Sequence, residues 1–92
     1  MLISFEGIEG AGKTTQIKLL EGYFLKNNKE VLLLREPGST ETGEEIRNIL
    51  LSNNNQISNN TELLLMFAAR AQLIDEIIKP NKDKVILIDR YF

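Results

Sequence analysis

Residues 7–14 read GIEGAGKT and directly follow the apolar run MLISF of residues 1–5. They match G-x-x-x-x-G-K-[ST] without a gap, a pattern typical of the loop that binds the phosphates of a nucleoside triphosphate. Glycines let the backbone curl so that N–H groups point inward, and a helix beginning at Lys13 adds the positive end of its dipole. We expect Lys13 to bridge the outer phosphates and the Thr14 hydroxyl to bind Mg²⁺.

The hydrophobic pattern around this loop predicts an α/β fold. Short apolar runs predict strands, and apolar residues at offsets of three and four predict helices. In chain order the expected elements are a strand over 1–6, a helix from Lys13 to about residue 26, a strand over 31–34, a helix from Thr42, a helix over about 61–79 and a strand over 85–88. This alternation favours a parallel sheet with right-handed crossovers.

Three finer details of these elements are also predicted. The continuous apolar run of residues 31–34 is typical of a strand covered on both faces. Thr42 with Glu45 fits a capping box for the second helix, and Asn59 with Glu62 fits a cap for the third. The buried stripe of the second helix is expected to comprise Ile46, Ile49 and Leu50.

Length and composition limit the class of protein. A chain of 92 residues that is 42% hydrophobic and 26% charged can form one domain with a modest core. The net charge of −2 gives no reason to expect nucleic acid or a membrane as a partner. The absence of cysteine and histidine excludes disulfides, thiolate metal sites and a serine–histidine triad. No apolar run is long enough for a membrane span and no secretory signal is seen, so we expect a cytoplasmic protein.

Asp89 supports the nucleotide-binding interpretation. It follows four apolar residues at the end of the last predicted strand. A carboxylate in that position next to a phosphate loop is expected to hold metal-bound water. The alternative is an ordinary aspartate that starts a turn after the strand.

A group of arginines suggests a second binding site, comprising Arg35, Arg47, Arg70 and Arg90. Arg35 and Arg90 follow apolar strand runs and are expected at the sheet edge where α/β folds bind ligands. Arg70 has apolar residues one helical turn away on both sides, so we expect it to be embedded in an apolar face with a partner for its guanidinium. A surface ion pair is the ordinary alternative for any one of the four.

Four stretches together resemble the N-terminal part of a thymidylate kinase: FEGIEGAGKTTQ, REPGSTETGEEIRNILL, TELLLMFAARAQL and VILIDRYF. The resemblance implies a phosphate-loop NTPase fold like that of nucleoside monophosphate kinases, a parallel sheet with flanking helices. It also implies a single kinase domain over residues 1–92, truncated after the third strand, with the lid and later strands absent. The implied reaction moves the γ-phosphoryl group of ATP to dTMP with Mg²⁺, giving dTDP, and family members are typically homodimers.

The same resemblance assigns residues to roles. ATP-binding residues are expected at Gly7, Ile8, Glu9, Gly10, Ala11, Gly12, Lys13, Thr14 and Thr15. Residues that bind the acceptor are expected at Arg35, Glu36, Pro37, Arg47, Met66, Phe67 and Arg70. Catalytic residues are expected at Lys13, Arg90, Asp89 and Glu9, and metal ligands at Thr14 and Asp89.

Individual contacts are implied as well. Glu9 is expected near the sugar and phosphate of the acceptor, Arg47 at its phosphate, and Arg70 at the edge of thymine. Arg90 is expected to reach the phosphates during transfer, and Arg35-Glu36-Pro37 to form one wall of the acceptor site.

The chain departs from the family pattern at three positions. Ser39 replaces a glycine, which strains the loop only if that position requires a positive φ. Met66 stands where the family often has a base-stacking phenylalanine, so either Met66 or the neighbouring Phe67 covers the base; plain core packing is the alternative for both, and we favour Phe67. Gly10 matches members that supply basic residues from a later lid.

Three other functions stay open at this point. One is a kinase of the same fold that acts on a different nucleoside monophosphate, from which Arg70 and its apolar neighbours would distinguish a thymidylate kinase. Another is a phosphate-loop switch protein that hydrolyses nucleotide, although water as the nucleophile needs no second cluster of arginines. The third is a non-catalytic nucleotide-binding fragment.

Overall fold

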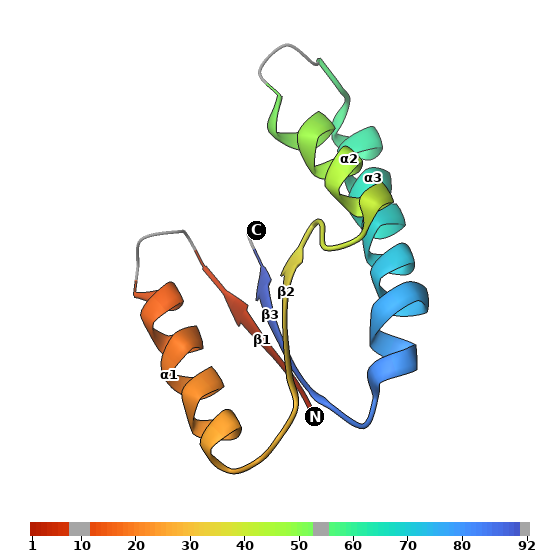
Figure 1. The fold of residues 1–92 in the computed structure, drawn as a ribbon. Coiled ribbons are helices and arrows are strands. Elements are labelled where there is room, and N and C mark those ends of the chain that lie inside the picture. The colour runs from red at the N-terminus through yellow and green to blue at the C-terminus, as the bar shows by residue number, and fades with distance from the viewer. Residues whose placement is uncertain (8–11, 53–55, 91–92) are drawn as a thin grey trace. The chain divides into compact units, whose positions relative to one another are not determined.

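The computed structural model describes residues 1–7, 12–52 and 56–90, and the predicted order of elements is confirmed (Figure 1). The elements are β1 (Leu2–Glu6), α1 (Lys13–Lys26), β2 (Val31–Glu36), α2 (Glu41–Leu51), α3 (Asn59–Leu73), a π-helical turn (Ile74–Ile78), a 3₁₀ turn (Lys79–Asn81) and β3 (Val85–Arg90). The chain divides into two compact units, one of Met1–Arg35 with Asn81–Phe92 and one of Glu36–Pro80. None of the described helices is long and apolar enough to cross a membrane.

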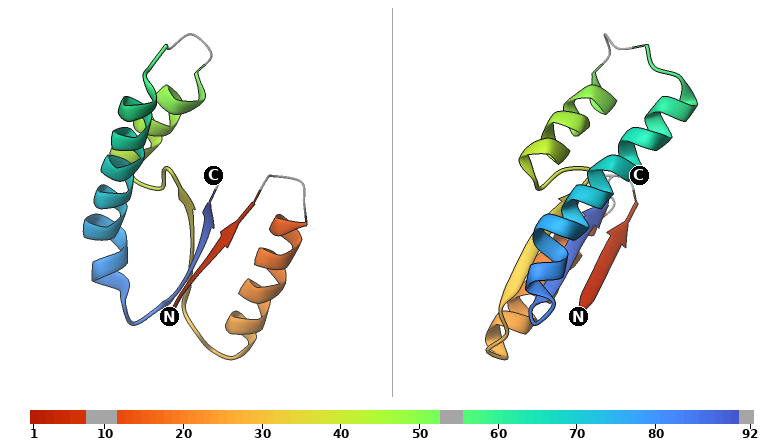
Figure 2. Two further views of the ribbon diagram at one scale, coloured as in Figure 1. Left: turned by 180° about the vertical axis from the view of Figure 1, so that it is seen from behind. Right: turned by 90° about the vertical axis from the view of Figure 1, so that its right-hand side faces the viewer.

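The first unit contains a three-stranded sheet in the order β1-β3-β2, and the three strands run in the same direction (Figure 1). β1 pairs with β3 in parallel, with Leu2 opposite Ile86 and Glu6 opposite Arg90. α1 lies beside these strands in both views of Figure 2. The carboxyl ends of β1 and β3 therefore lie next to each other, near the start of α1.

The core of the sheet is its middle strand. Val85, Ile86, Leu87 and Ile88 of β3 are all buried. The prediction that β2 is covered on both faces is wrong, because Leu33 is 47% exposed. β2 lies at the edge of the described sheet, and an apolar run alone does not distinguish an edge strand from a central one.

The predicted end of α1 is confirmed and has a defined cap. Asn28 takes a left-handed conformation with φ 62° just past the helix. The Lys29 N–H donates to the Phe24 carbonyl at 3.0 Å, and the Asn28 N–H donates to the Leu25 carbonyl at 3.1 Å. These two bonds form a Schellman motif, with asparagine in the position that glycine usually takes.

The second unit begins with a loop followed by α2, and the predicted cap of α2 is wrong. The helix starts at Glu41, with Thr40 as its N-cap in an extended conformation. The Thr40 Oγ1 atom accepts a hydrogen bond from the Gly43 N–H at 2.8 Å. Thr42 has the glutamate three residues on that a capping box requires, whereas Gly43 stands three residues after Thr40. The backbone path of the loop therefore selects Thr40 against the side-chain pattern.

α3 also starts earlier than predicted. Ser58 is its N-cap, and its Oγ atom accepts from the Thr61 N–H at 3.1 Å. The cap predicted at Asn59 is therefore wrong, and Asn59 is the first residue of the helix. Serine and asparagine are comparable caps, so residue type does not separate the two neighbouring positions.

The buried face of α2 is set by a glycine. Gly43, Ile46 and Arg47 are buried, and Leu50 is half-buried. A Cβ atom on Gly43 would lie 2.8 Å from both the Gly38 carbonyl oxygen and the Thr40 hydroxyl. Ile49 of the same helix is 39% exposed, which corrects its predicted place in the stripe.

Ser39 occupies a strained backbone position. Its φ is +73°, and the preceding Gly38 has φ +137°. A side chain in this region costs on the order of 1–2 kcal/mol. The loop therefore does require a positive φ where the family pattern has glycine, and Ser39 carries the corresponding strain.

We predict that Gly43→Ala destabilises the protein by roughly 1–3 kcal/mol, because its methyl group would overlap backbone atoms of the preceding loop. Gly22→Ala is the matched control, since Gly22 lies in α1 and a methyl group there would meet no other atom within 4 Å. Gly22→Ala should stabilise the protein by roughly 0.5–1 kcal/mol. Urea unfolding of the variants measures both, and equal stability of Gly43→Ala and the parent chain would refute the close packing.

We predict that Ser39→Gly stabilises the protein by up to about 1 kcal/mol, because relief of strain exceeds the added entropy of the unfolded chain. Ser58→Gly is the control, because Ser58 has an ordinary φ of −69°. This variant is expected to lower the free energy of unfolding by a few tenths of a kcal/mol. Thermal unfolding of both variants gives the sign. A lower midpoint for Ser39→Gly would show that the serine is not strained.

Candidate functional site

The ends of the predicted phosphate loop are shaped as the motif requires. Gly7 and Gly12 have φ values of +136° and +80°, which favour glycine. α1 begins directly after Gly12, at Lys13. The predicted site residues Ile8, Glu9, Gly10 and Ala11 lie outside the described residues. Thr14 and Thr15 are exposed in the first turn of α1.

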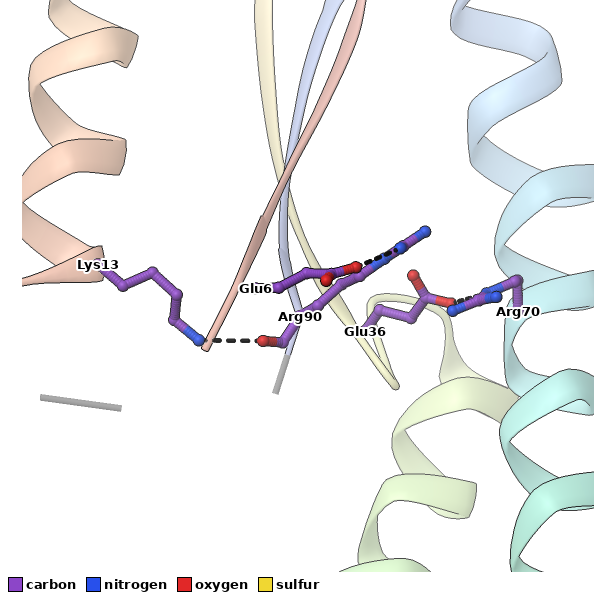
Figure 3. Close-up of polar contacts among 5 residues, drawn as sticks. All are labelled: Glu6, Lys13, Glu36, Arg70 and Arg90. Atoms are coloured by element: carbon purple, nitrogen blue, oxygen red, sulfur yellow. Dashed lines mark hydrogen bonds and ion pairs between the residues drawn. The ribbon is translucent and has the colours of Figure 1, made fainter. Parts of the chain in front are cut away.

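Lys13 is held at the carboxyl ends of β1 and β3. Its side chain is buried, with 6% of its surface exposed. The Nζ atom donates to the Gly7 carbonyl at 2.9 Å and to the Arg90 carbonyl at 3.0 Å, the latter drawn in Figure 3. It also lies 2.7 Å from the Asp89 Oδ1 atom. The ammonium charge is thus fixed beside the loop by oxygen atoms alone.

Asp89 has capacity for a further ligand. Its Oδ1 atom is buried and accepts no well-directed hydrogen bond from the described residues, even though the Lys13 ammonium lies within ion-pair distance. Buried carboxylate oxygens are normally satisfied by donors or cations. The described residues contain no group of three or more His, Cys, Asp or Glu side chains that could hold a metal ion. A metal here would therefore need ligands from a bound molecule, as Mg²⁺ commonly does with phosphates.

Arg90 is paired with Glu6, a residue that the sequence did not single out. The Nη1 atom of Arg90 donates to the Glu6 Oε1 atom at 2.9 Å (Figure 3). The parallel register places Glu6 directly opposite Arg90 at the ends of the two strands. The sequence signal for this pair is weak: both residues follow apolar runs expected to end at the same sheet edge, but only the register of the structure puts them opposite each other.

In the second unit, Arg70 of α3 forms an ion pair with Glu36 (Figure 3). The Nε atom of Arg70 donates to the Oε1 atom of Glu36. The Glu36 side chain is 8% exposed, whereas that of Arg70 is 41% exposed. The prediction that Arg70 has a partner is confirmed, but its embedding in an apolar face is wrong, because Phe67, one turn away, is itself 53% exposed.

Arg47 of α2 contacts the loop that directly follows Glu36. Its side chain is buried, and its Nη1 atom donates to the Pro37 carbonyl at 2.9 Å. Three predicted acceptor-site residues, Glu36, Pro37 and Arg47, therefore meet around one turn of backbone. Met66 is half-buried on α3, and Arg35 is exposed near the end of β2.

Comparisons with known proteins identify the family. The model of the thymidylate kinase family matches residues 5–92. The chain belongs to the thymidylate kinase family. A thymidylate kinase from Thermoanaerobacter sp. (strain X514) is 56% identical over 91 residues, which are 97% of this chain and 45% of that protein. One from Thermosipho africanus is 52% identical over 99% of this chain and 46% of its own length.

A solved structure agrees with the sequence relatives. The thymidylate kinase of Ehrlichia chaffeensis matches with a TM-score of 0.82 and 41% identity, over 98% of this chain and 52% of that one. The expected fold class, a phosphate-loop parallel sheet with flanking helices, is thereby confirmed. The chain spans about half the length of the curated thymidylate kinases it matches.

Proposed function

We propose that this chain carries the nucleotide-binding residues of a thymidylate kinase, which transfers the γ-phosphoryl group of ATP to dTMP to give dTDP. The observation that supports this best is the position of Lys13. Its ammonium lies at the carboxyl ends of two parallel strands, directly after a phosphate-loop motif and beside Asp89. Membership of the thymidylate kinase family supports the identity of the acceptor.

On the donor side, residues Gly7 to Thr15, Glu9 included, bind the phosphates of ATP. The N–H groups at the start of α1 and the positive end of its dipole face this loop. Lys13 exchanges the carbonyl oxygens it now contacts for the outer phosphate oxygens. Its burial strengthens that contact, because the charge is poorly screened by water.

The residues present fit a Mg²⁺ ion that is shared with the nucleotide. The Thr14 hydroxyl and the Asp89 carboxylate would hold it, directly or through water, and the buried Oδ1 atom of Asp89 has capacity for such a contact. When bound, the ion neutralises charge on the outer phosphates. Asp89 otherwise stays an ion-pair partner of Lys13.

On the acceptor side, dTMP binds to the cluster in the second unit. Arg70 donates to the edge of thymine, Arg47 lies at the phosphate, and Glu36 and Pro37 form one wall. Arg35, which directly precedes them in the chain, is the last residue of the first unit and was predicted with them. Phe67 stacks on the base, which its exposure permits, and Met66 lies beside it. Glu9 lies near the sugar and phosphate of dTMP.

The transfer requires little acid–base chemistry from the protein. An oxygen of the acceptor phosphate is already nucleophilic, so the absence of histidine costs nothing. Lys13 and Arg90 neutralise the charge on the group in transfer, and the Glu6 carboxylate holds the Arg90 guanidinium in place beforehand. Positioning and charge neutralisation supply most of the rate enhancement.

We further propose that both compact units belong to one kinase domain, and that the protein acts as a cytoplasmic homodimer without a nucleic-acid or membrane partner. A second candidate function is that these 92 residues bind nucleotides without transferring phosphate. The curated thymidylate kinases that the chain matches are about twice as long.

Two variants should separate the two nucleotide sites. Lys13→Ala should weaken binding of ATP–Mg²⁺ about tenfold or more and leave dTMP nearly unaffected, because a charged hydrogen-bond donor contributes roughly 1.5–3 kcal/mol. Arg70→Ala should weaken binding of dTMP by a similar factor and leave the affinity for ATP–Mg²⁺ nearly unchanged. Isothermal titration calorimetry measures both, with Lys18→Ala, an exposed lysine of α1, as the control.

Titrations with UMP and GMP test the choice of acceptor. The proposal requires the parent chain to bind dTMP more tightly than UMP or GMP. Equal losses of affinity for all three nucleotides in Arg70→Ala would contradict the proposed contact of Arg70 with the base. An assay for dTDP then distinguishes the two functions. Turnover supports transfer by the chain itself, whereas binding of ATP and dTMP without turnover supports the binding function.

A further inference from the structure

We propose that Glu36 is a positioning residue that fixes the guanidinium of Arg70 and thereby sets discrimination at the base of the acceptor. The carboxylate of Glu36 would act through Arg70 and not by a hydrogen bond to the base, whereas its backbone belongs to the wall of the acceptor site. The inference rests on the proposed function, because it concerns how the acceptor site of that function selects its base.

Glu36 is the last residue of β2, and α2 holds the loop that follows it at successive positions. The Arg47 guanidinium donates to the Pro37 carbonyl at 2.9 Å. The next carbonyl, of Gly38, lies so close to Gly43 that a methyl group there would not fit. These contacts come from the first two turns of α2 and restrain the backbone immediately after Glu36.

The strained residue of the loop is restrained in the same way. The Ser39 N–H donates to the Glu44 Oε2 atom at 2.7 Å, and Thr40 caps α2 through Gly43. Ser39 keeps a φ of +73° under these restraints. A backbone held in a costly conformation by several independent contacts is a common feature of functional sites. These contacts restrain the backbone directly after Glu36, the last residue of β2.

The pair with Arg70 is asymmetric in its burial. The Glu36 side chain is almost completely buried, whereas the Arg70 side chain is 41% exposed. A buried, backbone-anchored carboxylate has little freedom, so it determines where the more mobile arginine lies. The Nε–H group of Arg70 is directed to Glu36, and recognition of a ligand falls to the terminal N–H groups at the other end of the guanidinium.

A fixed arginine discriminates between bases by chemistry. The guanidinium only donates hydrogen bonds, so it can donate to the carbonyl oxygen at position 4 of thymine but not to the amino group that cytosine carries there, which is itself a donor. An arginine that is free to change rotamer loses most of this discrimination, because it can move away from the amino group of cytosine and avoid the contact between two donors. Glu36 therefore affects the ratio of the affinities for dTMP and dCMP more than it affects binding of the phosphate.

The test compares the affinities of dTMP and dCMP for the parent chain and for Glu36→Gln, measured by calorimetry. Glutamine keeps the size of the side chain and removes the charge that fixes Arg70. We expect the ratio of the two affinities to fall about tenfold, while the affinity for ATP–Mg²⁺ stays unchanged. Glu45→Gln is the matched control, because Glu45 is an exposed carboxylate on α2, and it should leave the ratio unchanged.

The outcomes separate this inference from the proposed function. A parent chain that prefers dTMP, with an unchanged ratio in Glu36→Gln, overturns the positioning role and leaves the proposed function intact. A parent chain that binds neither nucleotide overturns both. If circular dichroism shows that Glu36→Gln does not fold, Glu36→Asp replaces it in the test. The shorter side chain should lower the ratio of the dTMP and dCMP affinities by a smaller factor. An unchanged ratio in folded Glu36→Asp overturns the inference.

Discussion

The ammonium group of Lys13 is the point on which the first unit depends. It is buried among the Gly7 carbonyl, the Arg90 carbonyl and the Asp89 carboxylate, at the ends of two parallel strands. A buried positive charge is stable only when such oxygens surround it. The parallel pairing of β1 with β3 supplies them, because it brings residues 7 and 89–90 to the same edge of the sheet. The arrangement positions a cation beside the phosphate loop before any nucleotide binds.

The second unit depends on a different constraint, the close approach of α2 to the loop before it. Gly43 permits that approach, and the resulting geometry allows Glu44 and Arg47 to bind backbone atoms of the loop. The energy of these contacts offsets the strain at Ser39. The loop in turn presents Glu36 to Arg70. Each unit therefore fixes an arginine or lysine by oxygen atoms of nearby backbone or carboxylates.

Much of this organisation is predictable from the sequence. The phosphate-loop motif, the order of the elements, the start of β3 and the ends of α1 follow from periodicity and from residues with strong local preferences, such as glycine and the Asn27-Asn28 pair. The partners of Arg90 and Arg70 are not predictable in this way. Glu6 and Glu36 lie far from them in sequence, and pairing across strands or from loop to helix depends on register and on the path of the chain.

The errors have a common physical origin. The predicted caps of α2 and α3 are displaced by one or two residues because several suitable side chains occur in succession, and the backbone path selects among them. Ile49 and Leu33 are exposed although each stands in an apolar pattern that predicts burial. Neither exposure is encoded in a local hydrophobic pattern. The positive φ of Ser39 is visible only in the backbone itself.

The central claim is that Lys13 and Arg70 serve different nucleotides, and NMR titration of the isotope-labelled chain tests it most directly. Addition of dTMP should shift the signals of Glu36, Arg47 and Arg70, including the Nε–H group of Arg70, and leave those of Gly12 to Thr15 nearly unchanged. Addition of ATP with Mg²⁺ should produce the opposite pattern. Shifts at the phosphate loop caused by dTMP alone, with none at Arg70, would contradict the account.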